Sequence, residues 1–490
     1  MSIDDKKEKT AVENPLGTKP LGRLLFSLAI PTVIANVVNA LYNIVDQIFI
    51  GQGVGTLGNA ATSVAFPLTT VCMALGLMLG LGAAAGFNLE LGQGNAAGKN
   101  DTLRKAHEER AKEIVGAAVS AMLISGVVIL ILVKLFLRPL LTAFGATENI
   151  LPYAEDYAGI TSWGIPFFLF MMGANPLVRA DRNAKYAMAA VITGAVLNMI
   201  LDPLFIFVFG WGISGAAWAT VISQVVSAVM LALYFSKFKS VDFVIKDFIP
   251  VVSAGDDYPV DRSLGEYIRT VLHICKLGFN SLIFQMSTLI VQVTMNNMLR
   301  IYGERSIYGA DTPIAVAGIV MKINVIFIAL MIGLISGAQP ICSYNYGAGK
   351  YQRVRGTVKL FTLWALIIGV FSWVLFELFP EQFISLFGRA DGDELYFEYA
   401  KRFMRTFLFF VFLNGIQICS ATFFPSIGKA GRGAFLSFSK QILFMIPLLL
   451  ILPAFYGLDG VMYAQPAADA LSFILAVTFL IHEMMVMPKS

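Results

Sequence analysis

The stretch of sequence that decides the fold runs from Leu24 to Gly51 and reads LLFSLAIPTVIANVVNALYNIVDQIFIG. It is almost entirely apolar. A helix needs about 20 residues to cross the hydrocarbon core of a bilayer, and this stretch is longer. We therefore predict a transmembrane helix. A carboxylate, Asp46, lies near its end, where the cost at mid-membrane would be about 2.5–3.5 kcal/mol. An ionisable residue in such a place indicates a functional site.

Asp46 is the last member of a polar stripe. Asn36, Asn39, Asn43 and Asp46 are spaced by three, four and three residues, so they share one face of the helix. A polar stripe in a membrane must face protein or water, because lipid offers no hydrogen-bonding partner. Upstream of the stripe, Pro31 removes a backbone donor and can bend the helix. We interpret Pro31 as a hinge, with a static kink as the alternative.

The composition extends this interpretation to the whole chain. Of its 490 residues, 57% are hydrophobic and only 14% are charged, whereas soluble domains are about 25% charged. The mean hydropathy is +0.72. We predict an all-α integral membrane protein with twelve spans, at residues 24–49, 60–88, 114–137, 153–176, 185–209, 214–235, 268–300, 313–345, 356–379, 398–426, 432–454 and 458–482.

The connections between these spans predict the orientation. Most Lys and Arg residues fall in alternate connections, whereas opposite ones such as residues 51–59 carry none, so the positive-inside rule places both termini in the cytoplasm. The net charge of +4 therefore reflects topology and does not indicate nucleic acid. The first apolar run is too long for a cleavable signal peptide. We divide the chain into a cytoplasmic tail (1–23), an N-lobe (24–236), a cytoplasmic linker (237–267), a C-lobe (268–483) and a cytoplasmic C-terminus (484–490).

The two lobes resemble each other in sequence. The segment 211–219, WGISGAAWA, matches 456–464, YGLDGVMYA, and Pro176 before one basic loop matches Pro425 before another. Two six-helix repeats of the same orientation imply pseudo-two-fold symmetry about the membrane normal, with a transport path between them.

The N-lobe holds the strongest candidate site. Asn198 and Asp202 are four residues apart and share a helix face, and we expect Pro203 to bias Asp202 away from the α conformation. Together with Asp46 and Thr220 they offer oxygen ligands that suit a proton, Na⁺ or another hard cation and do not suit zinc. The alternative is that these groups only join helices by hydrogen bonds.

The C-lobe has a second polar stripe, at spacings of four, three and four residues: Ser281, Gln285, Thr288 and Gln292. Its charged candidates are Lys322, Lys440 and Asp469. We expect Lys440 to reach the cytoplasmic surface along its apolar stem, and Asp469 to line a cavity, with an untested pairing to Lys322. For the substrate cavity we propose Asn39, Asn43, Gln285, Gln292, Lys322 and Asp469.

The sequence contains no motif for a nucleotide site, a zinc protease or a serine hydrolase. The four cysteines lack metal-type spacing. We therefore expect no enzyme, no cofactor beyond H⁺ or Na⁺ as coupling ion, and no nucleotide or nucleic-acid partner. The expected partners are small amphipathic molecules and the lipid bilayer, and we expect a monomer.

Several motifs together resemble the multidrug and toxic compound extrusion (MATE) family. They are Pro31 to Asn36 with Val45 to Gly51, then residues 175–183 (NPLVRADRN), residues 198–203 (NMILDP) and residues 212–220 (GISGAAWAT). The resemblance covers essentially the whole chain and is greatest to the bacterial branch that includes staphylococcal-type multidrug exporters. It implies two six-helix bundles in a V and export of amphipathic, mostly cationic compounds in exchange for H⁺ or Na⁺. It also implies the plasma membrane of a bacterium.

The resemblance assigns the family's cation site to Asp46, Asn198, Asp202 and Thr220, with Asn175 as a further member, and the family's bent first helix to Pro31. In one respect the sequence differs from other branches, which use a glutamate on span 7 and an aspartate on span 10. Here span 7 offers Gln285 and Gln292, which favours coupling in the N-lobe. The alternatives are a flippase for a lipid-linked precursor or a narrow-specificity metabolite exporter of the same superfamily.

Overall fold

The computed structural model describes residues 14–97, 100–144, 146, 148–251, 263–309, 311–385 and 394–488. Within these residues every regular element is a helix. In the described part of the chain, eleven helices are long and apolar enough to cross a membrane. A twelfth span forms if Tyr396–Phe407 and Val411–Ser426, bent by 47° at a short break, are counted as one. The predicted twelve-span helical fold is thus confirmed, with one span broken.

The first half of the chain forms a bundle of long helices and two short breaks. Its elements are α2 (Leu21–Gly53), α3 (Thr56–Ala96), α4 (Asp101–Ala143), α5 (Leu151–Thr161), a 3₁₀ turn (Ser162–Gly164), α6 (Ile165–Ala180), α7 (Ala184–Pro203), a π-helix (Leu204–Val208) and α8 (Gly212–Phe235). A 3₁₀ turn (Ile245–Phe248) follows in the connection between the halves. Residues 252–262 of the expected linker lie outside the described residues.

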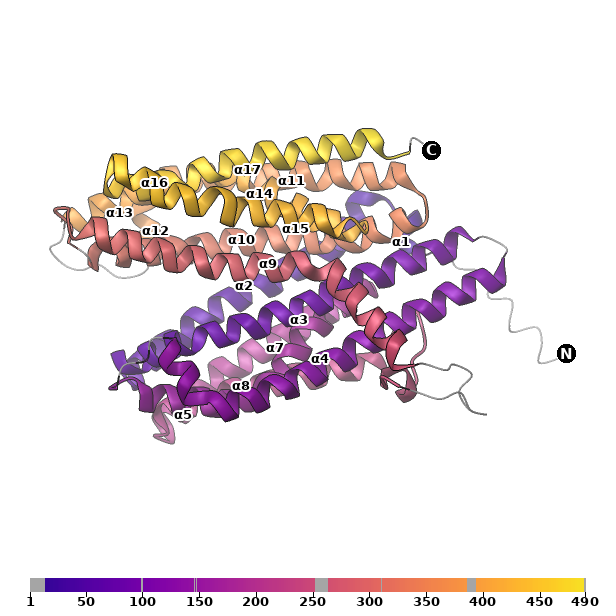
Figure 1. The fold of residues 1–490 in the computed structure, drawn as a ribbon, viewed down its shortest axis with the longest axis horizontal. Helices are drawn as coiled ribbons and strands as arrows, with labels where there is room; N and C mark the ends of the chain where they lie inside the picture. The colour runs from indigo at the N-terminus through magenta and orange to yellow at the C-terminus, as the bar shows by residue number, and fades with distance from the viewer. Residues whose placement is uncertain are drawn as a thin grey trace.

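The second half forms the other bundle. Its elements are α9 (Leu264–Gly303), α10 (Asp311–Gly347), α11 (Tyr351–Leu378), α12 (Pro380–Ser385), α13 (Glu394–Phe407), α14 (Val411–Ser426), α15 (Ala430–Phe438), a π-helix (Ser439–Met445), α16 (Ile446–Tyr456) and α17 (Leu458–Val486). Figure 1 shows the two bundles one above the other, with most of α9 to α17 in the upper one.

The halves approach each other closely where glycines remove side chains. A Cβ on Gly82 of α3 would lie 2.1 Å from the Ile274 carbonyl oxygen of α9, and one on Gly92 would lie 2.2 Å from the Tyr344 carbonyl oxygen of α10. A Cβ on Gly337 would lie 2.5 Å from the Ala29 nitrogen of α2. These contacts all fall toward the ends of α3 and α10 at Ala96 and Gly347, which we call the terminal side.

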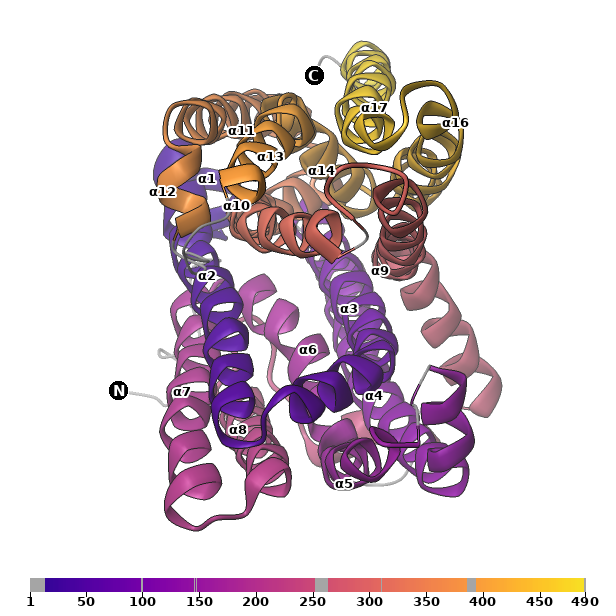
Figure 2. The same ribbon diagram turned by 90° about the vertical axis from the view of Figure 1, so that its left-hand side faces the viewer.

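Toward the opposite side, which we call the open side, α2 leaves α10 and packs against α7, and Figure 2 shows α2 and α3 extending from the upper bundle into the lower one. The halves are therefore joined at the terminal side and diverge from it. This arrangement corresponds to the V that the sequence resemblance implies.

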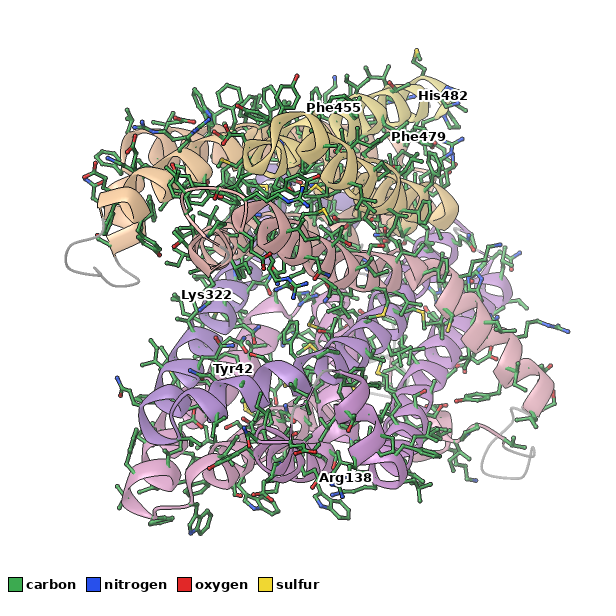
Figure 3. The ribbon with its side chains drawn as sticks, turned by 60° about the vertical axis from the view of Figure 1, so that its left-hand side comes forward. Tyr42, Arg138, Lys322, Phe455, Phe479 and His482 are labelled. Atoms are coloured by element: carbon green, nitrogen blue, oxygen red, sulfur yellow. The ribbon has the colours of Figure 1, made fainter. Side chains whose placement is uncertain are left out.

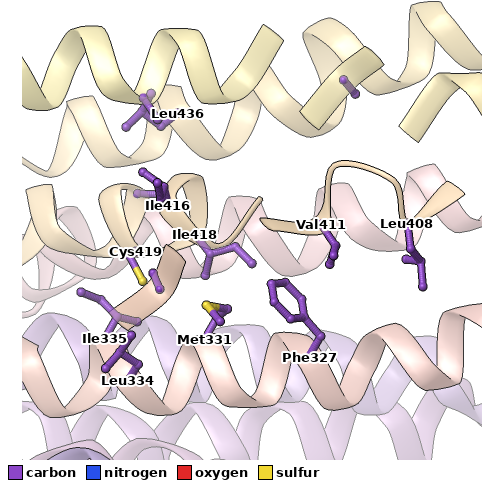
Figure 4. Packing of buried hydrophobic residues seen from close by; sticks show 14 of the residues in the cluster. Phe327, Met331, Leu334, Ile335, Leu408, Val411, Ile416, Ile418, Cys419 and Leu436 are labelled. Carbon is purple, nitrogen blue, oxygen red and sulfur yellow. The ribbon is translucent and has the colours of Figure 1, made fainter. Parts of the chain in front are cut away.

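Each half has its own apolar core, but the first long helix of each half begins in the core of the other. The core of the second half contains Phe327 and Met331 of α10 with Val411 of α14 (Figure 4), and it also contains Leu24 and Leu25 of α2. The core of the first half, built around Phe87, Val115 and Leu177, contains Tyr267 and Ile274 of α9. In Figure 1 the first part of α9 leaves the upper bundle and runs down beside the lower one. In terms of packing, the start of the predicted N-lobe therefore belongs with the C-lobe.

The described end of the predicted N-terminal tail is also folded. Residues Pro15–Thr18 form the short helix α1, and Leu16 is buried. Asn345 Nδ2 of α10 donates to the Leu16 carbonyl at 2.8 Å. From the other half, Arg182 Nη1 donates to Asn14 Oδ1 at 3.4 Å. The segment before the first span thus touches both halves, whereas residues 1–13 lie outside the described part of the chain.

Candidate functional site: a carboxylate cluster in the first half

Two carboxyl groups from different helices face each other inside the first half. Asp46 of α2 and Asp202 of α7 lie within hydrogen-bonding reach of each other. Asn198 Nδ2, one turn before Asp202, donates to Asp202 Oδ1 at 3.2 Å. The packing of α2 against α7 brings these side chains together. The structure therefore joins three of the residues that the sequence analysis assigned to one site.

Several oxygens of this cluster have no hydrogen-bond donor among the described residues. They are Asp46 Oδ1, Asp202 Oδ2 and Asn198 Oδ1, and each is buried. Buried polar atoms are nearly always paired, and each exception calls for a ligand, an ion or a water molecule. Oxygens that only accept hydrogen bonds, from two acids and an amide, suit a proton or a hard monovalent cation. The cluster therefore fits the H⁺ or Na⁺ predicted from the sequence.

Two tyrosines complete the cluster. Tyr157 of α5 lies near both carboxyl groups and within hydrogen-bonding reach of Thr220 of α8, and Tyr42 of α2 lies one turn before Asp46. Neither tyrosine was among the site residues predicted from the sequence. The four-residue spacing from Tyr42 to Asp46 could have revealed the first. Nothing local in the sequence links Tyr157 to the site, because only the packing of α5 against α8 places it there.

The backbone near Asp202 differs from the prediction. Asp202 stays within α7, which continues through Pro203, and the irregular segment is the π-helix that follows, Leu204–Val208. The expectation that Pro203 removes Asp202 from the α conformation is therefore wrong. Pro203 still removes one backbone donor, and the π-helix begins at the residue after it. π-Helical segments of this kind are frequent at functional sites.

The structure does not bring Asn175 to the cluster. Its Nδ2 donates to the Ala187 carbonyl at 3.0 Å, and its Oδ1 accepts from Arg179. Ala187 lies near the start of α7 and Asp202 near its end, which separates them by about 22 Å at 1.5 Å per residue. The family resemblance therefore misplaced Asn175, which has a local role at the terminal side.

The remaining residues of the α2 stripe lie between the cluster and the second half. Asn36 Nδ2 approaches the Ala329 carbonyl of α10 at 3.5 Å, and Asn43 is exposed while donating to the Asn39 carbonyl at 2.6 Å. Pro31 lies within α2, which runs through it as one helix. Its role as a hinge stays a prediction.

The residues proposed for the cavity in the second half lie apart from one another. Gln285 is half-buried, whereas Gln292 and Lys322 are exposed. Figure 3 shows Lys322 where the two halves face each other, above Tyr42 of the first half. Asp469, in contrast, is 1% exposed and lies inside the second half.

The predictions for Lys440 and Asp469 need correction. Lys440 does not reach the surface, because it is 5% exposed and its Nζ lies 3.0 Å from Asp469 Oδ1. Lys322 is therefore not the described partner of Asp469. The sequence suggested a surface lysine because the position follows a basic loop, but the helix carries Lys440 inward against α17.

Comparison with known proteins agrees with this architecture. The profile of the MatE family matches residues 31–204 and 281–451, which together make up more than half of the chain. This chain belongs to the MatE family. Among its curated MatE relatives, the multidrug export protein MepA of Staphylococcus aureus (strain N315) is 23% identical and that of Staphylococcus saprophyticus is 22% identical. The first alignment covers 94% of this chain and 93% of the relative, and the second covers 95% of each.

A solved structure shares the fold over nearly the full chain. It is described as the outward-facing conformation of a multidrug resistance MATE family transporter, and it matches with a TM-score of 0.85 at 22% identity. The match covers 99% of this chain and 100% of that one. The family and the fold expected from the sequence motifs are confirmed, including the resemblance to staphylococcal exporters.

Proposed function

We propose that this protein is a secondary active exporter of amphipathic, mostly cationic small molecules, which it exchanges for H⁺ or Na⁺. The observation that carries this proposal is the pair of carboxyl groups from α2 and α7, whose buried oxygens have no described donor. The names of the relatives, which are multidrug export proteins, support the substrate class. We propose no nucleotide, nucleic acid or further cofactor, and a monomeric protein.

The arrangement of the halves supports an alternating-access cycle. The described contacts hold the halves together at the terminal side, which we assign to the bacterial cytoplasm because basic residues such as Lys350, Arg353 and Arg355 follow α10 there. A cation taken up from outside would reduce the negative charge of the Asp46–Asp202 pair. α2 would then bend at Pro31, and the substrate would leave. The reset would then open the terminal side.

One exchanged cation is sufficient for useful export. Moving one charge inward supplies about 2.3 kcal/mol per 100 mV, and a tenfold concentration gradient adds about 1.4 kcal/mol. The sum supports a substrate gradient of about a few hundredfold when the exchanged substrate moves no net charge.

The test is transport by purified protein in liposomes, with ethidium or a quaternary ammonium dye and either a pH gradient or a Na⁺ gradient. We expect one gradient to drive the dye and Asp46→Asn or Asp202→Asn to abolish that movement. Asp156→Asn is the matched control, because it makes the same chemical change at an exposed position of α5. Undiminished gradient-driven export by Asp202→Asn would refute the site. No movement by folded wild-type protein under either gradient would favour a lipid flippase or a narrow exporter.

A further inference from the structure

The second half contains a buried ion pair that the proposed transport cycle does not use. Lys440 is 5% exposed and Asp469 is 1% exposed, and Lys440 Nζ lies 3.0 Å from Asp469 Oδ1. The same ammonium group donates to Asn414 Oδ1 of α14. Gln465 Nε2, one turn before Asp469 on α17, contacts both carboxylate oxygens at 3.1 Å. Both charges are therefore paired and hydrogen-bonded.

The backbone beside this pair resembles the backbone beside the first cluster in one respect. Lys440 lies in the π-helix Ser439–Met445, which interrupts the span from α15 to α16. In the first half, Asp202 directly precedes Pro203 and the π-helix Leu204–Val208. Each half thus has a buried charged cluster beside the π-helical break of its fifth span. Asp202 lies near the end of its span, whereas Lys440 lies within the π-helix and nearer the start of its span. The two clusters thus share a π-helical break but not the same depth.

The charges of the two sites differ in a specific way. The first site has two carboxyl groups that face each other, with buried oxygens that have no described donor. The second has one carboxylate and one ammonium group, which neutralise each other. Leaving a buried charge unpaired is costly, and such a group is neutralised instead. The first site therefore needs a cation from solution, whereas the second does not.

We propose that Lys440 is a tethered cation that fills the site of the second half, so that only the first half takes up an exchangeable cation. Asn414, Gln465 and Asp469 are then the ligands of a monovalent cation site that is occupied by the chain itself. The role of Lys440 in transport rests on the proposed function. The site itself is tested by binding alone.

The test compares wild type with Asp469→Asn, Lys440→Met and the double variant. Methionine keeps the length of the side chain and removes its charge. Each purified protein is examined by infrared spectroscopy for protonated carboxyl groups and by equilibrium binding of ²²Na⁺. We expect wild type and Asp469→Asn to agree in both measurements. We expect Lys440→Met to gain one protonated carboxyl group or one bound Na⁺ per molecule, and the double variant to lose that gain.

Two results would overturn the proposal. One is a protonated carboxyl group or a bound Na⁺ in wild type that depends on Asp469. The other is a folded Lys440→Met protein that gains neither. If both single variants fail to fold, wild type is compared with the double variant, which has no unpaired charge at this site. Equal Na⁺ binding and equal carboxyl spectra would support the tethered cation, and a difference would refute it. Because no transport is measured, failure of the export hypothesis would appear separately, in the liposome experiment.

Discussion

Gly92 provides a direct test of the contact between the halves at the terminal side. A Cβ at this position would lie 2.2 Å from the Tyr344 carbonyl oxygen and 2.8 Å from the Ala348 nitrogen, whereas ordinary contact begins at 3.4 Å. Tyr344 belongs to the core of the second half, so Gly92→Ala requires α3 and α10 to separate by about 1.2 Å. Forcing extra volume into a packed interior costs about 1–3 kcal/mol, which corresponds to a population change of about 5–150-fold. We expect this variant to disfavour closure of the terminal side.

Spin-label distances can measure the shift. Cysteines at Ile48 of α2 and at Ile307, between α9 and α10, would carry the labels, because both positions are exposed and lie in different halves at the open side. The four native cysteines would first be replaced. We expect Gly92→Ala to increase the population with a short distance and to lower Tm.

The matched control is Gly318→Ala in α10, because a Cβ there would meet no atom within 4 Å. A helical alanine at an open position should leave the distances unchanged and stabilise the protein by up to about 1 kcal/mol. If Gly92→Ala gave the same distances and Tm as Gly318→Ala, close packing of α3 on α10 would not control closure of the terminal side.

Two further predictions concern the first half. Tyr157→Phe removes a hydroxyl group within hydrogen-bonding reach of Thr220. Because the lost hydrogen bond is worth about 1 kcal/mol, binding of the coupling ion should weaken about fivefold in equilibrium titrations. An unchanged affinity would show that Tyr157 is not part of the site. Asn175→Ala removes the described partner of Arg179 and should lower the free energy of unfolding, measured by thermal unfolding, by about 1–3 kcal/mol. The affinity for the coupling ion should stay as in wild type. Weakened ion binding would show that Asn175 is part of the site.

Much of the fold could be predicted because membrane helices leave strong sequence signals. Long apolar runs predicted the spans, and the four-residue spacing of Asn198 and Asp202 predicted half of the site. The break between α13 and α14 was missed, since the run from 398 to 426 contains no proline before Pro425. The periodicity of apolar and polar residues indicates which residues share a helix face, but it does not indicate where the helix bends.

Contacts between distant helices were less predictable. Tyr157 joins the cluster through the packing of α5 on α8, and Lys440 meets Asp469 through the packing of its π-helical segment on α17. Asn175 shows the opposite error, because a family motif placed it in a site that lies about 22 Å away along α7. A buried lysine and a surface lysine look alike in sequence, and only their neighbours distinguish them.

The exchange of first helices between the halves also has a consequence for assembly in the membrane. Synthesis proceeds from the N-terminus, so α2 to α8 enter the bilayer before Tyr267 and Ile274 of α9 exist to complete their core. In the same interval Leu24 and Leu25 cannot be buried, because the second half, whose core they join, has not yet been made. Neither bundle is a complete folding unit, and the two halves produced as separate chains would have to associate before either could reach its native packing.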